Sequence, residues 1–362
     1  MSGGRLWLTG LGRDLPGTAR EKHRIKAADR LLGNEGLWAQ SSLIYQALAA
    51  YLIGDVRHPV VLVDGTGVGP GHYALTAALA HRGRAFPLFS RVQGGFKQGV
   101  QVQRDFLASL AKILPSSCTP IIVTDAGFHS NWFDAVLKRG WHFVGRIRNR
   151  TQIHVDGEWV SAKSLHQQAG HSSVELGRLQ FRRSSPRRYR FVLAPQRRPR
   201  NRSRLTQKGK RRRDTTSIRR RRAAREPWLL ATSLERPSTQ VVAHYATRMQ
   251  IEETFRDLKN HRYGWALSDV RSKNPKRIEV LLLIASIAVV AMQIIGIASE
   301  KANLHRQLQA NTTYNRRVLS FFTLARRVIA NRLEPAAQAL RRASTKLRRQ
   351  LRGITATPLL ST

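Results

Sequence analysis

The order of strand-like and helix-like segments in the first half of the chain most constrains its fold. Three apolar or alternating runs with Gly and Pro between them come first, and helical and strand-like patterns then alternate. We expect strands at 60–64, 73–79, 85–91, 121–124 and 141–146, and helices at 99–114 and from about residue 130. Three strands followed by alternating helices and strands predict an α/β domain built on a mixed sheet.

This order of elements is the one that an RNase H-like mixed sheet requires, although several other α/β folds begin in the same way. With 362 residues, the chain can hold one substantial α/β core and smaller additions. We expect a helical N-terminal region, a core in two pieces, a β-rich basic subdomain inserted between these pieces, and a basic helical C-terminal region: residues 1–56, 57–150 with 226–300, 151–225 and 301–362.

The predicted insert changes character along its length. Residues 153–181 alternate in short segments between Gly turns and could form β-hairpins, whereas residues 181–225 are dense in Arg and Lys and contain Asp214 as their single acid. Such a basic segment cannot bury a core, so we expect it to stay mobile unless an anion lies beside it. Its run Arg219–Arg222 could contact DNA phosphates or remain a solvated loop.

The formal net charge of +41 indicates a polyanionic partner, because so many like charges repel one another unless something neutralises them. Nucleic acid is the first candidate and an acidic membrane surface is the second. Cys118 is the single cysteine, which excludes an internal disulfide framework and a cysteine-based zinc cluster and points to a reducing compartment. The first residues show no signal-peptide pattern, so we expect a cytoplasmic protein.

The apolar run Val280–Ala298 is long enough to raise a membrane span as an alternative. Gln293 and Gly296 interrupt this run, and the sequence shows no second span. A helix that is buried on most sides against a sheet explains the run as well. We therefore expect a core helix and no membrane partner.

A set of polar side chains is spaced at helical intervals near residue 250. If the segment is one helix, four of these side chains lie at offsets of three, four and seven residues and so share one face: Tyr245, Arg248, Glu252 and Lys259. A solvated helix with ion pairs between residues four apart would show a similar pattern. Two aspartates favour a functional interpretation, because Asp64 and Asp125 each follow an apolar strand-like run.

The spacing of Tyr, Arg, Glu and Lys, together with the two aspartates, resembles the bacterial insertion-sequence transposases of family four. The surrounding words Arg248–Lys259, Val123–Phe128 and Asp29–Asn34 are most similar to the insertion-sequence-ten branch of that family, which is also the branch of transposon ten. The resemblance runs from about Leu8 to about Arg327. It implies an RNase H-like catalytic core and a cut-and-paste transposase that works by a hairpin intermediate in the bacterial cytoplasm, near the nucleoid. The implied partners are the inverted repeats at the transposon ends, target DNA and a second copy of the chain in a homodimer.

The resemblance selects Asp64, Asp125 and Glu252 as a D-D-E triad of catalytic and metal-binding residues. Phosphodiester transfer needs an activated oxygen nucleophile and a shielded transition state, and two Mg²⁺ ions supply both. Mg²⁺ prefers hard oxygen ligands, so three carboxylates from distant positions suit it. We expect Mn²⁺ to substitute for Mg²⁺. Two neighbouring acids of the same helix, Glu253 and Asp257, are expected to turn away from this site.

Further residues are assigned to DNA by the same resemblance. Arg248 and Lys259 would hold phosphates near the scissile bond, and Tyr245 would donate a hydrogen bond to a phosphate oxygen. Trp228 would stack on a flipped base during hairpin formation, although a half-buried strand aromatic would look the same in the sequence. Arg146 would contact the DNA backbone or lie free at the surface.

The sequence departs from the family after the first aspartate. Gly65 stands where relatives usually carry Trp, and the glycines of Gly67–Gly71 lack the features of a phosphate loop. Together with an N-terminal region shorter than in relatives and a divergent C-terminal region, this raises the alternative of a degenerate copy. Two rival functions remain open, a nuclease of the same fold without strand transfer and a non-catalytic protein that packages nucleic acid.

Overall fold

The computed structural model describes residues 4–95, 99–148, 151–195, 226–310, 312–313 and 315–354. They fall into two units: unit 1 contains the chain up to Pro120 and again from Thr247 onward, and unit 2 contains Ile121–Ala246. Both terminal regions and the first three strands therefore share unit 1, whereas most of the predicted insert shares unit 2 with the strands next to it. The predicted contact segment Arg219–Arg222 lies outside the described residues.

Unit 1 is built on an antiparallel meander of β1 (Val60–Gly67), β2 (His72–Ala80) and β3 (Ala85–Gly94), in the order β3-β2-β1. The apolar runs predicted these strands correctly, and each strand extends beyond its predicted end. Val60 to Val63 are all buried, as expected of a strand that is covered on both faces. The pairing of Asp64 with Thr76 fixes the register of the strand that carries the first predicted catalytic residue.

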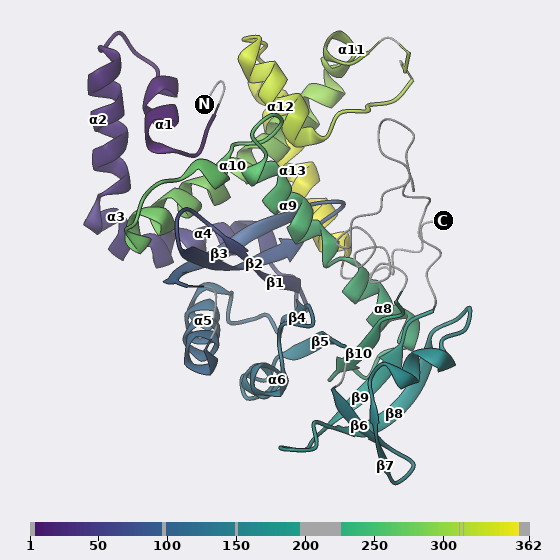
Figure 1. Ribbon diagram of the computed structural model, residues 1–362. Coiled ribbons are helices and arrows are strands. Elements are labelled where there is room, and N and C mark those ends of the chain that lie inside the picture. The colour runs from purple at the N-terminus through teal and green to yellow at the C-terminus, as the bar shows by residue number, and fades with distance from the viewer. Residues whose placement is uncertain are drawn as a thin grey trace, which may run out of the picture. The chain divides into compact units, whose positions relative to one another are not determined.

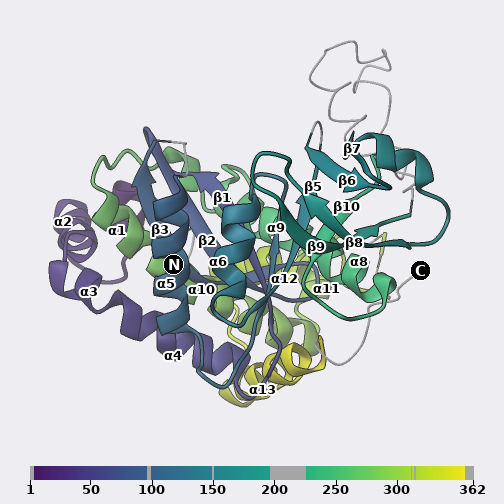
Figure 2. The ribbon, with the colours of Figure 1, turned by 90° about the horizontal axis from the view of Figure 1, so that it is seen from below.

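Two helices of unit 1 that matter for function are α9 (Met249–Lys259) and α10 (Pro275–Lys301), which lie on one face of the meander, with α5 (Val100–Ile113) on the other (Figure 1, Figure 2). Asn274 caps α10 by accepting a hydrogen bond from the Lys276 N–H, and Pro275 suits the first helical position. The 27-residue α10 is long and apolar enough to cross a membrane, but 67% of its most apolar window is buried. This burial, against β3 and neighbouring helices, supports the interpretation of α10 as a core helix.

The remaining helices of unit 1 come from the two terminal regions. The N-terminal region forms helices as predicted, and the C-terminal region adds three more: α1 (Leu8–Asp14), α2 (Glu21–Leu32), α3 (Glu35–Ala39), α4 (Ser41–Ile53), α11 (His305–Leu308), α12 (Phe321–Ala330) and α13 (Ala337–Ile354). A short 3-10 helix, η2 (Leu267–Asp269), lies between α9 and α10. Both α12 and α13 pack against α10, so the C-terminal region contributes to the core of unit 1.

Unit 2 carries a mixed sheet in the order β4-β5-β10-β9-β8-β6-β7. The β4 and β5 strands are parallel, and the other described neighbours are antiparallel: β4 (Ile121–Thr124), β5 (His142–Ile147), β6 (Gln152–Val155), β7 (Glu158–Ser161), β8 (Val174–Phe181), β9 (Arg187–Leu193) and β10 (Leu229–Thr232). The 3-10 helix η1 (Ser164–Gln168) and α8 (Ser238–Ala246) complete the unit. The predicted β-hairpins after residue 153 are confirmed, and so is the mixed α/β class.

The crossover helix α6 (Ser130–Leu137) joins the parallel strands β4 and β5. Phe133 of this helix stacks on Phe143 of β5 with ring centroids 4.4 Å apart. A side chain at Gly145 would overlap the Phe133 ring, so glycine permits this close packing. The helix thereby fixes β4, whose carboxyl end leads to Asp125.

Candidate active site

The polar segment from Tyr245 to Lys259 is not one helix. Helix α8 ends at Ala246, a turn follows at Thr247 and Arg248, and α9 begins at Met249. The prediction that all four polar side chains share one helical face is therefore wrong for Tyr245, which belongs to unit 2. The physical reason lies in tertiary packing: Tyr245 is only 3% exposed and packs within unit 2, and no Gly or Pro marks the break in the sequence.

Two predicted catalytic carboxylates meet in unit 1 around one guanidinium. Arg248 donates from Nη2 to Glu252 Oε1 at 2.5 Å, and its Nη1 lies 3.6 Å from Asp64 Oδ2. The Asp64 and Arg248 side chains are 16% and 15% exposed, and that of Glu252 is 38% exposed. The structure thus brings together side chains from β1 and the start of α9 at a half-covered site.

Local structure explains why these side chains face one another. Strand β1 is fully buried up to Val63 and becomes half-buried from Asp64 onward, where the backbone N–H of Gly65 donates to Asp64 Oδ1 at 2.8 Å. Helix α9 contacts β1 and buries an apolar face that includes Ile251 and Leu258. Glu252 sits in the first turn of α9, where the positive end of the helix dipole favours a carboxylate.

Lys259 shares this environment from the last turn of α9. Burial lowers the pKa of its ammonium group, and the negative charge of Asp64 acts in the opposite direction. Of the predicted site residues, unit 1 therefore gathers four around the same position: Asp64, Arg248, Glu252 and Lys259. Each of them lies on an element that the sequence pattern predicted.

Glu253 and Asp257 lie on another side of α9, as helix geometry predicted. Asp257 Oδ2 accepts from Arg84 Nε at 2.6 Å, and Glu253 Oε2 accepts from Arg256 Nη1 at 2.6 Å. Burial raises the pKa of the Asp257 carboxyl, while the adjacent Arg84 opposes that shift. These two acids are therefore engaged in ion pairs outside the site.

Asp125 follows β4 in unit 2, at the strand end where the sequence predicted it. Its Oδ1 accepts a hydrogen bond from the Gly127 N–H at 2.8 Å, so the carboxylate closes a tight turn. A side chain at Gly127 would approach this oxygen to 3.0 Å, which explains the small residue there. Among the described residues, no three His, Cys, Asp or Glu side chains form a group that could hold a metal ion.

The other predicted DNA contacts form a separate cluster in unit 2. The Trp228 and Tyr245 rings meet edge to face, with centroids 4.8 Å apart. Arg146 of β5 is hydrogen-bonded to Tyr245 and lies 3.2 Å from Glu226 Oε2. Burial lowers the pKa of the Arg146 guanidinium, the charge of Arg148 adds to that effect, and Tyr245 and Glu226 oppose it.

This cluster changes what its members can do in the described conformation. The Tyr245 phenol is buried, and the Arg146 side chain is 12% exposed and already paired with Glu226, so neither presents an open contact for phosphate. Trp228 is half-buried and directly precedes β10. Their roles in DNA binding stay predictions. Sequence reasoning missed Glu226, whose only signal is an acid at the end of a long basic segment.

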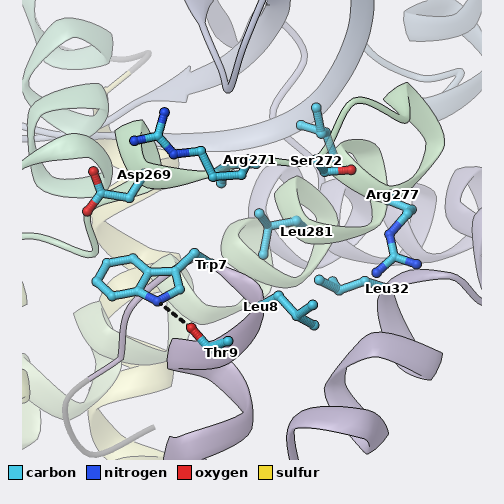
Figure 3. A pocket seen from close by; sticks show the side chains of 11 residues that line it. Trp7, Leu8, Thr9, Leu32, Asp269, Arg271, Ser272, Arg277 and Leu281 are labelled. Atoms are coloured by element: carbon cyan, nitrogen blue, oxygen red, sulfur yellow. Dashed lines mark hydrogen bonds between the residues drawn. The ribbon is translucent and has the colours of Figure 1, made fainter.

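A cavity of about 390 Å³ lies elsewhere in unit 1, between α1, α2, η2 and α10 (Figure 3). Trp7, Leu8, Leu32 and Leu281 contribute apolar wall, and Trp7 Nε1 donates to Thr9 Oγ1 at 3.0 Å. None of the predicted site residues lines this cavity. The carboxylate cluster is therefore a site at the surface of unit 1 rather than part of this cavity.

Comparisons with known proteins agree with the position of the cluster in the sequence. Residues 56–289 match the family model of the transposase DDE domain, and this range includes every residue of the carboxylate cluster. No curated protein matches the sequence. The cryo-EM structure of a piggyBac transposase synaptic complex with hairpin DNA is similar to the chain with a TM-score of 0.42 and 12% identity, over 95% of this chain and 65% of that chain. The chain thus spans about 65% of the length of that transposase, and so distant a likeness carries no argument about function. Because the family model covers more than half of the sequence, the chain belongs to the transposase DDE domain family.

Proposed function

We propose that this protein is a cut-and-paste DNA transposase with an RNase H-like core, which nicks transposon ends and transfers them to target DNA. The meeting of Asp64 and Glu252 around Arg248, inside the range that matches the family, is the observation that carries the proposal. The strong positive charge of the chain suits a DNA substrate. A homodimer that holds two transposon ends and a location in the bacterial cytoplasm belong to the same proposal.

The donor chemistry of the cluster fits a divalent metal ion. Carboxylate oxygens are the hard ligands that Mg²⁺ prefers, and the position between Asp64 and Glu252 already stabilises a positive charge, that of Arg248. Asp64, Glu252 and Asp125 would hold the ions, with Mg²⁺ as the expected metal and Mn²⁺ able to substitute. When bound, such ions would stabilise charge on the attacking and leaving oxygens of the phosphodiester.

The cations of the cluster have their own tasks in this proposal. Arg248 neutralises two carboxylates that would otherwise repel each other, and its planar guanidinium can turn to a phosphate and bind it in a bidentate manner. Lys259 supplies a point charge beside Asp64 for a second phosphate oxygen. We further propose that the freed 3′-OH attacks the opposite strand to form a hairpin, with Trp228 stacking on an extruded base.

A pair of neighbouring glutamates tests the proposal. Glu252→Gln removes a carboxylate charge from the cluster at constant size, whereas Glu253→Gln removes the same charge from an acid that is paired with Arg256. Mg²⁺-dependent nicking of a labelled duplex should fall by about two orders of magnitude or more for Glu252→Gln, and little for Glu253→Gln. Equal nicking by the two variants would overturn the assignment of the site.

Product analysis separates the proposal from its rivals. A transposase should join the nicked end to a target plasmid, whereas a nuclease of the same fold should stop at cleavage. A packaging protein should bind DNA and show no cleavage that depends on Asp64 or Glu252. Nicked product without joined product in the wild type would therefore favour the nuclease.

A further inference from the structure

The last described helix, α13, has one face buried in unit 1. Ala343, Leu347 and Leu351 recur every four residues and are at most 4% exposed. The helix packs against α4 and α10 (Figure 1, Figure 2). The apolar face of α13 is therefore already occupied by its own unit.

The rest of the helix surface is strongly basic. It carries no acid, and five exposed arginines project from it: Arg341, Arg342, Arg348, Arg349 and Arg352. At 100° per residue, Arg342 and Arg349 lie within about 20° of each other and roughly opposite the buried strip. Seven residues separate them, which corresponds to about 10.5 Å along the helix axis.

These arginines differ in whether the protein already neutralises them. The Arg348 guanidinium lies 5.6 Å from the centre of the Tyr51 ring, and Arg352 Nε lies 3.0 Å from Asp55 Oδ1. Within the described part of the chain, the side chains of Arg341, Arg342 and Arg349 make no hydrogen bond or ion pair. Three neighbouring cations are thus left exposed to solvent on one helix.

We propose that Arg341, Arg342 and Arg349, the α13 arginine face, form a docking surface for the phosphate backbone of double-stranded DNA. The surface goes beyond the proposed catalytic function, because its residues lie on a different element from β1 and α9 and its binding requires no cleavage. Guanidinium groups bind phosphate oxygens in a bidentate manner, and a row of them along a straight helix can follow a regular array of phosphates. The surface extends the DNA footprint without reading sequence.

The structure favours DNA over the other polyanions. A helix that lies in a membrane interface inserts its apolar face among the lipids, whereas the apolar face of α13 is buried against α4 and α10. An acidic protein partner would need an apolar patch at the centre of its interface, and the α13 arginine face offers only charged and polar side chains.

The experiment compares two variants that lose the same charge. Arg342→Gln/Arg349→Gln removes two unpaired cations, whereas Arg13→Gln/Arg178→Gln removes two cations that are about equally exposed but paired with Glu21 and Glu235. Equilibrium binding of the full chain to a 40-base-pair duplex of about random sequence is measured without divalent metal over a range of salt concentrations. The slope of log affinity against log salt should decrease by about 1.8 for the α13 variant, at about 0.9 per phosphate contact, and should not change for the control.

Further arms keep the result unambiguous. Gln preserves helix propensity, so the thermal unfolding midpoint should match the wild type, and Arg342→Lys/Arg349→Lys should restore most of the slope. Equal slopes in the α13 variant and the control would overturn the proposal. Loss of binding to phosphatidylserine vesicles with unchanged binding to DNA would also overturn it, in favour of a membrane surface. Because binding is measured without cleavage, a protein that fails to nick DNA still tests this proposal.

Discussion

The ring of Tyr73 lies over the backbone of Gly65, the residue that follows Asp64 on β1. A side chain at position 65 would overlap the Tyr73 Oη, Cε1 and Cζ atoms. Gly65 pairs with Leu75 and Tyr73 pairs with Gly67, so the two residues are diagonal neighbours on the same face of the β1–β2 pair. The tyrosine of β2 therefore fills the space that a larger residue at position 65 would take.

This packing predicts that Gly65→Ala impairs the site. The new methyl group must displace the Tyr73 ring or shift the backbone, and the Gly65 N–H holds Asp64 Oδ1 at 2.8 Å. We expect Mg²⁺-dependent nicking to fall about tenfold or more, which corresponds to about 1.4 kcal/mol in the barrier. Gly94→Ala in β3 is the control, because no atom lies within 4 Å of the Cβ it would add.

A second substitution tests whether the ring is the cause. Gly65→Ala/Tyr73→Ala removes the overlap, so its nicking should exceed that of Gly65→Ala alone. Non-additivity of this kind is expected only of residues in contact. If the double variant is no better than Gly65→Ala, the packing of Tyr73 on Gly65 does not position Asp64.

The sequence predicted those features that depend on local pattern. The β-branched run before Asp64 and the apolar face of α9 each specify one element, and both elements have the predicted type. Helix geometry also separated Glu252 from Glu253 correctly. The carboxylate pair in unit 1 followed from these local patterns together with the family resemblance.

Features that depend on tertiary packing could not be predicted. The break between α8 and α9 carries no Gly or Pro, and the burial of Tyr245 against Trp228 decides it. The pairing of Arg146 with Glu226 joins positions that are distant in the sequence, and nothing local distinguishes this arginine from its exposed neighbours. The overlap of Tyr73 with Gly65 depends on strand register, which hydrophobic pattern alone leaves open.

Gly296 permits the close approach of α10 and α12, and its replacement should destabilise unit 1. A Cβ at this position would lie 2.5 Å from the Phe321 carbonyl oxygen and 2.8 Å from its Cα, and backbone atoms cannot move aside as a side chain can. We expect Gly296→Ala to cost about 1–3 kcal/mol of unfolding free energy. Gly353→Ala in α13 meets no atom within 4 Å and should be neutral or stabilising, because alanine favours the helix. Equal unfolding midpoints for the two variants would contradict the close contact.

His81 should make the stability of the protein depend on pH in the acid range. Burial, with a smaller contribution from Arg82, lowers the pKa of this imidazole to about 4, although Gln350 opposes the shift. Because the folded pKa lies below the ordinary value of 6.5, the unfolded chain binds a proton first as the pH falls. Stability from the neutral imidazole is therefore lost between about pH 6.5 and pH 4, by ~3 kcal/mol at most.

Denaturant unfolding at several pH values measures this dependence. His81→Gln cannot titrate, so its free energy of unfolding relative to the wild type should rise as the pH falls through this range. Replacement of the exposed His171 by Gln should leave the pH profile unchanged. A constant difference between His81→Gln and the wild type would show that His81 does not titrate in this way.

Trp228 provides the sharpest distinction between a transposase and a simple nuclease. If its indole stacks on an extruded base, Trp228→Ala should leave first-strand nicking nearly intact, because Asp64, Arg248 and Glu252 are untouched. Hairpin formation should fall by about tenfold or more, since base stacking on an aromatic ring contributes about 1–3 kcal/mol. Trp159→Ala is the control, because Trp159 is a half-buried indole of β7 in the same unit whose ring packs on His154.

A third variant separates stacking from local packing. Trp228 also meets Tyr245 edge to face, so its loss could loosen that contact, whereas Trp228→Phe keeps an aromatic ring for both purposes. A labelled transposon-end duplex resolved on a denaturing gel separates nicked from hairpin product. Trp228→Phe should retain most of the hairpin yield, and equal yields from the wild type and Trp228→Ala would reduce Trp228 to a packing residue of unit 2. Wild-type protein that nicks the duplex and forms no hairpin would instead favour the nuclease, because the strand end must then leave the site without attacking its partner strand.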